Sequence, residues 1–339
     1  MWPRAQLARA LTWTSERAET PHRLRVTTKT AAFQRTSQRA INRARCASGW
    51  EKGRWSCYEA SMTLARLADV LAPARASGKG LGAFNVFSIE HAEAFTAAAE
   101  AAETAVVLQI SQNAVRYHKA LAPIGLATLT LARNAAVPVV VHLDHATDRR
   151  LVEEAIALGF GSVMFDASTM AYDENVTATA AVVQLCHEGG LDAEAELGEI
   201  GGKDGVHAAG ARTRPEEARA FAIATGVDAL AVAVGTSHAM TERRVALDLE
   251  LISALRRAVP VPLVLHGSSG VPDRELVRAI EAGMTKINIA THLNQVFSES
   301  VRATLAAYPD MVDSRRYLGP ARDAVAVEAE RLLRLLDGS

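Results

Sequence analysis

The sequence is poor in cysteine and in aromatic residues, and it has no long apolar run. Only 3 of its 339 residues are Cys, and Phe, Trp and Tyr make up 5% of the chain. Cys46 and Cys57 lie near the N-terminus, so Cys186 has no partner in the rest of the chain and a disulfide framework is excluded there. No apolar stretch has the length of a signal peptide or a membrane span. We therefore expect a cytoplasmic protein with no membrane partner and a core of Ala, Val and Leu.

Net charge is also nearly absent, but the charged residues are unevenly distributed. The formal net charge is −1, yet residues 1–60 carry 12 Lys or Arg against 4 Asp or Glu, and the remaining residues carry 25 against 34. An acidic body argues against nucleic acid as the main partner. The basic leader lacks hydrophobic periodicity, so we expect residues 1–61 to be an extension that is disordered or precedes a true start at Met62. A transit peptide or a nucleic-acid-binding arm is the alternative.

From Met62 onward, short apolar runs alternate with stretches of helical length. The predicted strands are Gly82–Val86, Ala105–Ser111, Val137–His145, Ser162–Ala167, Leu191–Leu197, Ala229–Gly235, Val261–His266 and Lys286–Thr291. Predicted helices include residues 62–77, 89–102, 149–158, 174–187 and 215–225, with one more over 320–336. Eight such repeats predict an α/β protein with a (β/α)8 TIM barrel over residues 62–339. A doubly wound sheet is disfavoured because no glycine-rich turn follows the first strand.

Histidines lie at the carboxyl ends of three predicted strands. His142 and Asp144 share one face of the third strand, and His145 follows where that strand ends. His238 follows the sixth strand, and His266 is the last residue of the seventh. A barrel displays its active site at this end, so imidazoles from three strands predict a site for a divalent metal, zinc above all, with an open position for substrate. Taken singly, each of these residues could be a structural histidine.

Other polar residues follow the same strands. Asp166 ends the fourth strand, and Glu194 and Glu196 share a face of the fifth, where one enters the barrel mouth or both are solvated. The glycine-rich segment 266–270 follows the seventh strand, and loops at this place in a barrel commonly bind phosphate, although a plain tight turn is the alternative. Neutral hydrogen-bonding groups suited to a polyhydroxylated ligand end the first two strands: Asn85, Gln109 and Ser111.

Together these segments resemble the class II, metal-dependent ketose-bisphosphate aldolases, which include fructose-1,6-bisphosphate and tagatose-1,6-bisphosphate aldolases. The resemblance runs from about Met62 into the C-terminal tail. It is carried by AFN (83–85), LQIS (108–111), HLDH (142–145), SVMFDAS (162–168), EAELGEIGG (194–202), VGTSH (234–238), HGSSG (266–270), KINIAT (286–291) and RRYLGPARDA (315–324). HLDH, EAELG and HGSSG in this order are highly specific for the family.

The resemblance implies a metal centre with defined ligands. His145, His238 and His266 would hold catalytic zinc, while Asp166 and Glu196 would form or border a second divalent-metal position. A monovalent cation near the phosphate is also implied. Zinc would act as a Lewis acid on the charge that aldol cleavage creates, so no Schiff-base lysine is required.

The resemblance also implies catalytic and substrate-binding residues. Asp144 would be the general acid and base that exchanges a proton with the aldehyde oxygen. Asp204 is the nearest candidate for the second proton-transferring group, which the family usually supplies as a Glu on a mobile loop. The residues expected around a ketose 1,6-bisphosphate are Asn85, Ser111, Ala239, Gly267, Ser268, Ser269, Asn288, Ile289, Ala290 and Thr291. We expect a phosphosugar as the small-molecule partner and a homo-oligomer, either dimer or tetramer.

Three departures from the family pattern accompany the resemblance. Ala239 stands where the family usually has Gly, Asp204 stands in place of the usual loop Glu, and Arg212 replaces the usual Tyr before Thr213. These changes indicate a divergent subgroup, with a different aldehyde as one interpretation. Independently of them, tagatose 1,6-bisphosphate or another phosphorylated sugar is the alternative substrate. A metal-dependent barrel hydrolase is disfavoured, because Gly82–Val86 lacks two histidines two residues apart. Another phosphosugar lyase or epimerase, or an aldolase-like barrel without activity, completes the alternatives.

Overall fold

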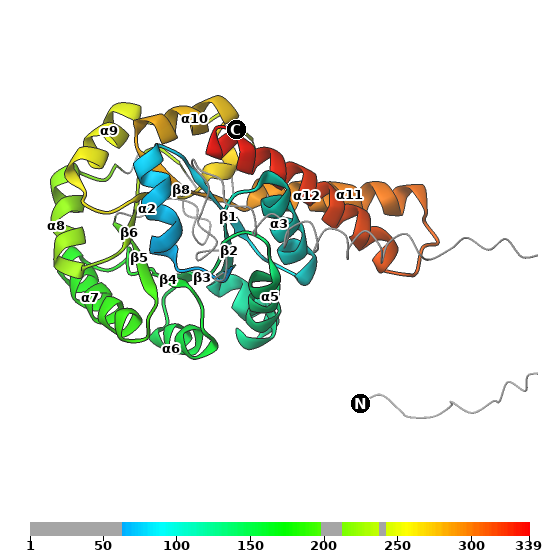
Figure 1. Ribbon diagram of the computed structural model, residues 1–339, viewed down its shortest axis with the longest axis horizontal. Coiled ribbons are helices and arrows are strands. Elements are labelled where there is room, and N and C mark those ends of the chain that lie inside the picture. Colours follow the sequence, from blue (N-terminus) through cyan, green and yellow to red (C-terminus); the bar gives the residue numbers. More distant parts are fainter. Residues whose placement is uncertain (1–62, 198–211, 237–241) are drawn as a thin grey trace, which may run out of the picture. The chain divides into compact units, whose positions relative to one another are not determined.

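The computed structural model describes residues 63–197, 212–236 and 242–339, so the expected extension over 1–61 lies outside the described part. Eight parallel strands close into a barrel in chain order, with β8 pairing to β1 (Figure 1). The strands are β1 (Leu81–Asn85), β2 (Val106–Ser111), β3 (Val139–Ala146), β4 (Ser162–Phe165), β5 (Asp192–Leu197), β6 (Ala229–Val232), β7 (Leu263–Leu265) and β8 (Met284–Ile289). The predicted (β/α)8 barrel is therefore confirmed.

Helices surround the barrel and cover the outer faces of its strands (Figure 1). They are α2 (Leu67–Ser77), α3 (Ile89–Ala102), α4 (Gln112–His118), α5 (Ala122–Asn134), α6 (Arg149–Leu158), α7 (Tyr172–Glu188), α8 (Pro215–Thr225), α9 (Leu249–Ala258), the short 3₁₀ helix η2 (Ser268–Gly270), α10 (Asp273–Ala282), α11 (Thr291–Ala307) and α12 (Arg315–Asp337). The predicted bounds of α3, α6 and α8 are confirmed. Local signals explain two of them. The Asp148 carboxylate caps α6 and Pro215 starts α8, while Gly159 and Gly226 end these helices at positive φ.

Three predicted helix starts are wrong, and the smallest difference is at α7, which begins at Tyr172 rather than at residue 174. Helix α2 begins at Leu67 rather than at residue 62, because Leu64 forms an isolated parallel bridge with Val139 before the helix starts. Helix α12 begins at Arg315 rather than at residue 320, where the Asp313 carboxylate accepts a hydrogen bond from the Arg315 backbone N–H. Five observed strands (β1, β4, β6, β7 and β8) end one to three residues before their predicted ends, because the last predicted residues already belong to loops or, at Thr291, to a helix.

Side chains inside the barrel change from apolar to polar toward the carboxyl ends of the strands. The lower interior is an apolar cluster of Ala65, Leu67, Val70, Leu71, Leu81, Ala83, Val107, Val140, Ala229, Ala231 and Val264. Two residues further along three of these strands, on the same face, Val107 gives way to Gln109, Val140 to His142 and Val264 to His266. We call the buried polar set the upper interior; it comprises Gln109, His142, Asp144, Glu194, Glu196, His266 and Lys286.

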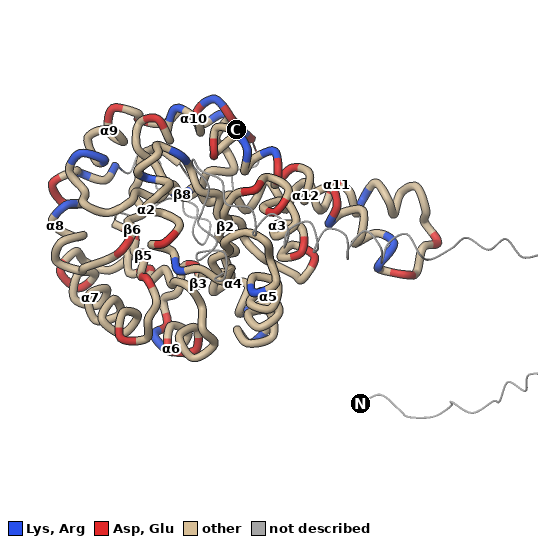
Figure 2. The backbone as a smooth tube through the Cα atoms, viewed as in Figure 1, with Lys and Arg blue, Asp and Glu red and all other residues tan. Residues whose placement is uncertain are grey.

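Charged residues are therefore not confined to the surface. Figure 2 shows acidic and basic residues both on the outer helices and on strands inside the ring that these helices form. Helices α11 and α12 pack against each other and extend away from the barrel (Figure 1). In the part of the chain that the structure describes, no helix combines the length and the apolar character needed to cross a membrane.

Candidate active site

A bulge near the carboxyl end of β3 redirects His145. The register between β3 and β4 shifts between Leu143 and Ala146, and His145 has a φ of 50°. Regular alternation would place His145 on the face opposite Asp144, whereas here its ring centroid lies 4.9 Å from that of His266. A non-glycine residue in the left-handed region is strained, and such residues cluster at functional sites. The backbone of β3 is thus shaped to bring His145 toward the barrel axis.

Three side chains from different strands form a candidate metal centre. His145 on β3, Glu196 on β5 and His266 after β7 each offer one ligand atom, and these atoms lie within 4.8 Å of one another. Two imidazole nitrogens and a carboxylate oxygen are donors that zinc and related divalent metals accept. His238, the third predicted imidazole, lies outside the described residues, so its place in the centre stays a prediction.

His266 lies between two buried carboxylates. Its Nδ1 lies 3.1 Å from Glu196 Oε2, and its Nε2 lies 3.0 Å from Glu194 Oε1. Burial alone would lower the pKa of His266, but hydrogen bonds to Glu194 and Glu196 outweigh it and raise this pKa to about 9. The surroundings of this imidazole therefore favour a positive charge beside it, whether a proton or a metal ion. Binding a metal there requires the ring to release a proton.

His145 also has a carboxylate behind its ring. His145 Nδ1 lies 2.7 Å from Asp166 Oδ2, and the Ser168 hydroxyl donates to Asp166 Oδ1 over 2.7 Å. A carboxylate in this position fixes the tautomer and orientation of a ligand imidazole. The structure thus brings Asp166 to the site as a partner of His145. Its expected role at a second metal stays a prediction.

Asp144 lies beside this cluster and is held by a hydrogen bond to one of its two carboxylate oxygens. Asn85 Nδ2 donates to Asp144 Oδ2 over 3.2 Å, and Gln109 Nε2 in turn donates to Asn85 Oδ1 over 3.1 Å. Oδ1 of Asp144 is buried and has no hydrogen-bond partner among the described residues. Burial would raise the pKa of Asp144, but His145, Lys286 and other nearby groups together hold it below its usual value. Asp144 is therefore an ionised carboxylate, and no other described residue occupies its Oδ1 acceptor.

The loop after β7 packs against the end of β8. Gly267 adopts the left-handed conformation with φ 65°, which suits glycine, and the short helix η2 follows. The Ser269 hydroxyl oxygen accepts a hydrogen bond from the Ala290 backbone N–H over 3.2 Å. The neighbouring Ser268 hydroxyl instead donates to the Leu265 carbonyl over 3.0 Å. The contact between Ser269 and Ala290 joins the two loops where barrel proteins commonly bind phosphate.

The remaining predicted substrate residues fall into three groups. Asn288 is buried near the end of β8 and its Oδ1 has no partner within the described ranges, while Thr291 opens α11, where a helix N-terminus favours an anion. Ser111 ends β2 and its hydroxyl caps α4. The Ile289 side chain packs in the core outside the barrel, so only its backbone is left for a ligand. Asp204 and Ala239 lie outside the described residues.

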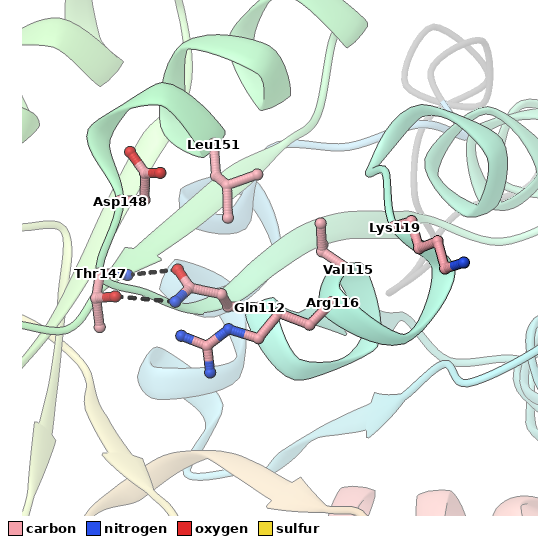
Figure 3. Close-up of a pocket in the computed structure, with 7 residues that line it drawn as sticks. All are labelled: Gln112, Val115, Arg116, Lys119, Thr147, Asp148 and Leu151. Atoms are coloured by element: carbon pink, nitrogen blue, oxygen red, sulfur yellow. Dashed lines mark hydrogen bonds between the residues drawn. The ribbon is translucent and has the colours of Figure 1, made fainter.

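A pocket of about 430 Å³ is lined by segments that follow Ser111 and His145 in the chain (Figure 3). Gln112 and Thr147 form one wall and exchange two hydrogen bonds of 2.9 Å, which tie the segment after Ser111 to the loop after His145. The full lining is Gln112, Val115, Arg116, Lys119, Thr147, Asp148 and Leu151. The paired amide and hydroxyl thus hold two predicted site residues at a fixed separation.

Sequence reasoning missed one pair of residues in the upper interior. From the sequence alone Glu194 could equally be solvated, and Lys286 had no role. Both are fully buried, and Lys286 Nζ forms an ion pair of 2.8 Å with Glu194 Oε2. A lysine in a strand with no other charged residue was the available signal, because a buried ammonium group requires a buried anion.

Comparison with known proteins agrees with this geometry. Residues 65–339 match the family model described as fructose-bisphosphate aldolase class-II. A probable fructose-bisphosphate aldolase from Bacillus subtilis is 38% identical over 269 residues, covering 78% of this chain and 94% of the relative. A fructose-bisphosphate aldolase from Thermus caldophilus is 39% identical over 285 residues, covering 76% of this chain and 92% of the relative.

Solved structures give the same result. The crystal structure of the YdjI aldolase from Escherichia coli K12 has a TM-score of 0.72 and 30% identity, covering 81% of this chain and 98% of that chain. A putative fructose-1,6-bisphosphate aldolase from Coccidioides immitis has a TM-score of 0.73 and 29% identity, with coverage of 80% and 96%. The chain belongs to the class II fructose-bisphosphate aldolase family.

Proposed function

We propose that the protein catalyses the reversible aldol cleavage of fructose 1,6-bisphosphate into dihydroxyacetone phosphate and glyceraldehyde 3-phosphate. The relatives named above carry fructose-bisphosphate aldolase in their names, and the family is a family of lyases. The observation that carries the proposal is the cluster of His145, Glu196 and His266 beside Asp144, whose Oδ1 has no hydrogen-bond partner within the described part of the chain. Tagatose 1,6-bisphosphate is the second candidate substrate.

The residues at the site fit a divalent metal, in keeping with the metal dependence of the family. His145 and His266 would hold zinc together with His238, and Glu196 would serve the same centre or a neighbouring one. Bound zinc would supply Lewis-acid stabilisation of the negative charge that cleavage leaves on the dihydroxyacetone phosphate half. A second divalent metal at Asp166 and a monovalent cation near the phosphate stay predictions.

Asp144 supplies the proton transfer at the bond that breaks. The substrate loses its C3–C4 bond when the proton of its C4 hydroxyl is removed, and an ionised carboxylate with a free oxygen is suited to take that proton. Asn85, held by Gln109, keeps the carboxylate in place through its other oxygen. In the condensation direction, the same group returns the proton to the aldehyde oxygen. Asp204 remains the candidate for the second proton transfer.

The loops after β7 and β8 would bind the phosphate of the dihydroxyacetone half. The Ser269 hydroxyl accepts from the Ala290 N–H, so its own proton is available to an anion. The first turn of α11 adds the positive end of a helix dipole. Binding at this end positions the sugar so that its C3–C4 bond lies near the centre.

A coupled assay on fructose and tagatose bisphosphates, with metal content measured on the same sample, tests the proposal. We expect cleavage of fructose 1,6-bisphosphate, complete loss of activity after treatment with a chelator, and recovery when zinc is added back. Persistent activity in metal-free protein would contradict the metal-dependent mechanism. Cleavage of neither bisphosphate by the metal-loaded protein would contradict the substrate.

Two further expectations concern the state of the protein. We expect a homo-oligomer, in keeping with the exposed Tyr308 and Val312 at the far end of the α11–α12 pair, and light scattering measures it. We also expect a cytoplasmic location. Cys186 is a free, buried thiol, and burial raises its pKa to about 12, as suits a packed rather than a reactive cysteine.

A further inference from the structure

We propose that Lys286 and Glu194 form a buried positioning pair that fixes the His266 ring and reserves its Nδ1 for the metal. The inference rests on the proposed metal-dependent function. The three residues come from β8, β5 and the end of β7, and all are 0% exposed. Strands β5 and β8 are not neighbours in the barrel, so the contact between Glu194 and Lys286 crosses its interior.

The contacts form one chain of three groups. Lys286 Nζ lies 2.8 Å from Glu194 Oε2, and Glu194 Oε1 lies 3.0 Å from His266 Nε2. The other ring nitrogen, Nδ1, faces Glu196, which belongs to the candidate metal centre together with His145. Glu194 therefore engages the nitrogen that points away from the centre. A ring that donates its Nε2 proton to Glu194 presents the lone pair of Nδ1 to a metal.

Lys286 offsets the free-energy cost of burying the Glu194 carboxylate inside the barrel. A fully buried carboxylate is costly unless a cation pairs with it. Lys286 is the one Lys or Arg among the buried side chains of the described residues. Its register partners, Leu81 on β1 and Val264 on β7, are apolar members of the lower interior. The long side chain thus begins in the apolar layer and carries its ammonium group up to Glu194.

Glu194 is distinguished from its neighbours on the same strand by what it contacts. Asp192, Glu194 and Glu196 follow each other on one face of β5, and all are buried. Asp192 pairs with Arg66 and accepts a hydrogen bond from the Ala68 N–H, far from the centre along the strand. Asp192 is therefore a matched control: an equally buried carboxylate with a cationic partner that does not touch a predicted metal ligand.

The test compares three variants by zinc affinity, measured by competition with a chromophoric chelator at fixed pH, and by the visible spectrum of the cobalt-substituted protein. Lys286→Met and Glu194→Gln should each weaken zinc binding by about 10- to 100-fold and alter the cobalt spectrum, because removing the partner of a ligand histidine has effects of this size. The glutamine amide would donate to Nε2 and drive the ring proton to Nδ1. Asp192→Asn should keep both the wild-type affinity and the wild-type spectrum.

The outcomes distinguish failure of the proposed metal-dependent function from failure of the proposed positioning pair. Wild-type protein that binds no zinc overturns the proposed function itself. If the wild type binds zinc and Glu194→Gln keeps the wild-type affinity and cobalt spectrum, the proposal of a positioning pair is overturned. Equal weakening in Asp192→Asn also overturns it, because the loss is then general destabilisation. The near-isosteric Glu194→Gln decides the matter if Lys286→Met does not fold, and partial recovery of affinity in Lys286→Arg supports a role for the buried charge.

Discussion

The lower and upper halves of the barrel interior are buried to the same degree but are built from opposite kinds of side chain. Leu71, Val107 and Val264 in the lower interior are at most 1% exposed, and so are Glu194 and His266 in the upper interior. The lower half is closed by helix α2, whose Leu67, Val70 and Leu71 belong to its apolar cluster. The upper half lies at the carboxyl ends of the strands, where the candidate metal centre is.

The difference shows that the same strands supply an apolar layer to the lower half of the interior and a layer of buried polar and charged groups to the upper half. Apolar side chains in the lower half gain free energy by leaving water, which stabilises the barrel. The buried groups of the upper half gain little by burial and must pair with one another, as the charged and polar groups of Lys286, Glu194, His266 and Glu196 do. Substitutions in the upper half should therefore mainly lower activity, whereas substitutions in the lower half should mainly lower the free energy of unfolding.

Of the substitutions that distinguish the two halves, Asp144→Asn in the upper half is expected to have the largest effect. The amide cannot accept the C4 hydroxyl proton, so kcat should fall by at least ~100-fold, as for loss of general acid and base catalysis. The protein should still bind dihydroxyacetone phosphate and keep its metal. Steady-state kinetics, ligand titration and metal analysis on one sample measure this. Turnover equal to that of the wild type would remove Asp144 from the mechanism.

The opposite result is expected from Leu71→Ala in the lower half. Leu71 is 1% exposed, and deleting a buried leucine side chain leaves a cavity. The free energy of unfolding should fall by about 2–5 kcal/mol, while kcat per folded molecule stays unchanged. Denaturant unfolding and kinetics at low temperature measure the two quantities. A parallel fall in kcat would show that the lower interior also shapes the site.

Much of the fold follows from the sequence, because hydrophobic periodicity and local signals carry it. All eight strands were expected, since each is a short apolar run between helical stretches. Strand ends were less certain: Thr291 was expected in a strand but begins α11. The start of α2 was also missed, because the bridge from Leu64 to Val139 joins residues far apart in the chain. Long-range pairing of this kind leaves no periodic pattern.

The candidate site was predictable in its members but not in its contacts. His145, Glu196 and His266 were named from the sequence, and the structure brings them together. The bulge and positive φ that redirect His145 were not foreseeable, because alternation in a regular strand points it the other way. The pair of Lys286 and Glu194 depends on which strands face each other across the closed barrel. Spacing along the chain does not contain that information.

A third region, the core outside the barrel, should respond to acid. His91 is buried against Phe87, Phe95 and Phe297, and burial lowers its pKa to about 4 from an ordinary value near 6.5. The unfolded chain therefore takes up this proton first, so stability present above pH 6.5 is lost as the pH falls toward 4. Between pH 7 and pH 5 the loss from this group is about 2 kcal/mol. Urea unfolding of wild type and His91→Phe at both pH values measures it, and equal losses in the two proteins would exclude His91 as the cause.

The smallest expected effect separates two adjacent serines at the rim of the upper interior. The Ser269 hydroxyl accepts from the Ala290 N–H and so has a proton free for a phosphate, whereas the Ser268 hydroxyl already donates to the Leu265 carbonyl. Ser269→Ala should raise KM for the bisphosphate about tenfold, since a hydrogen bond to a charged group contributes about 1.5–3 kcal/mol. Ser268→Ala should lower stability slightly and leave KM unchanged. The coupled assay measures both, and a larger KM change in Ser268→Ala would show that the phosphate binds elsewhere in the loop.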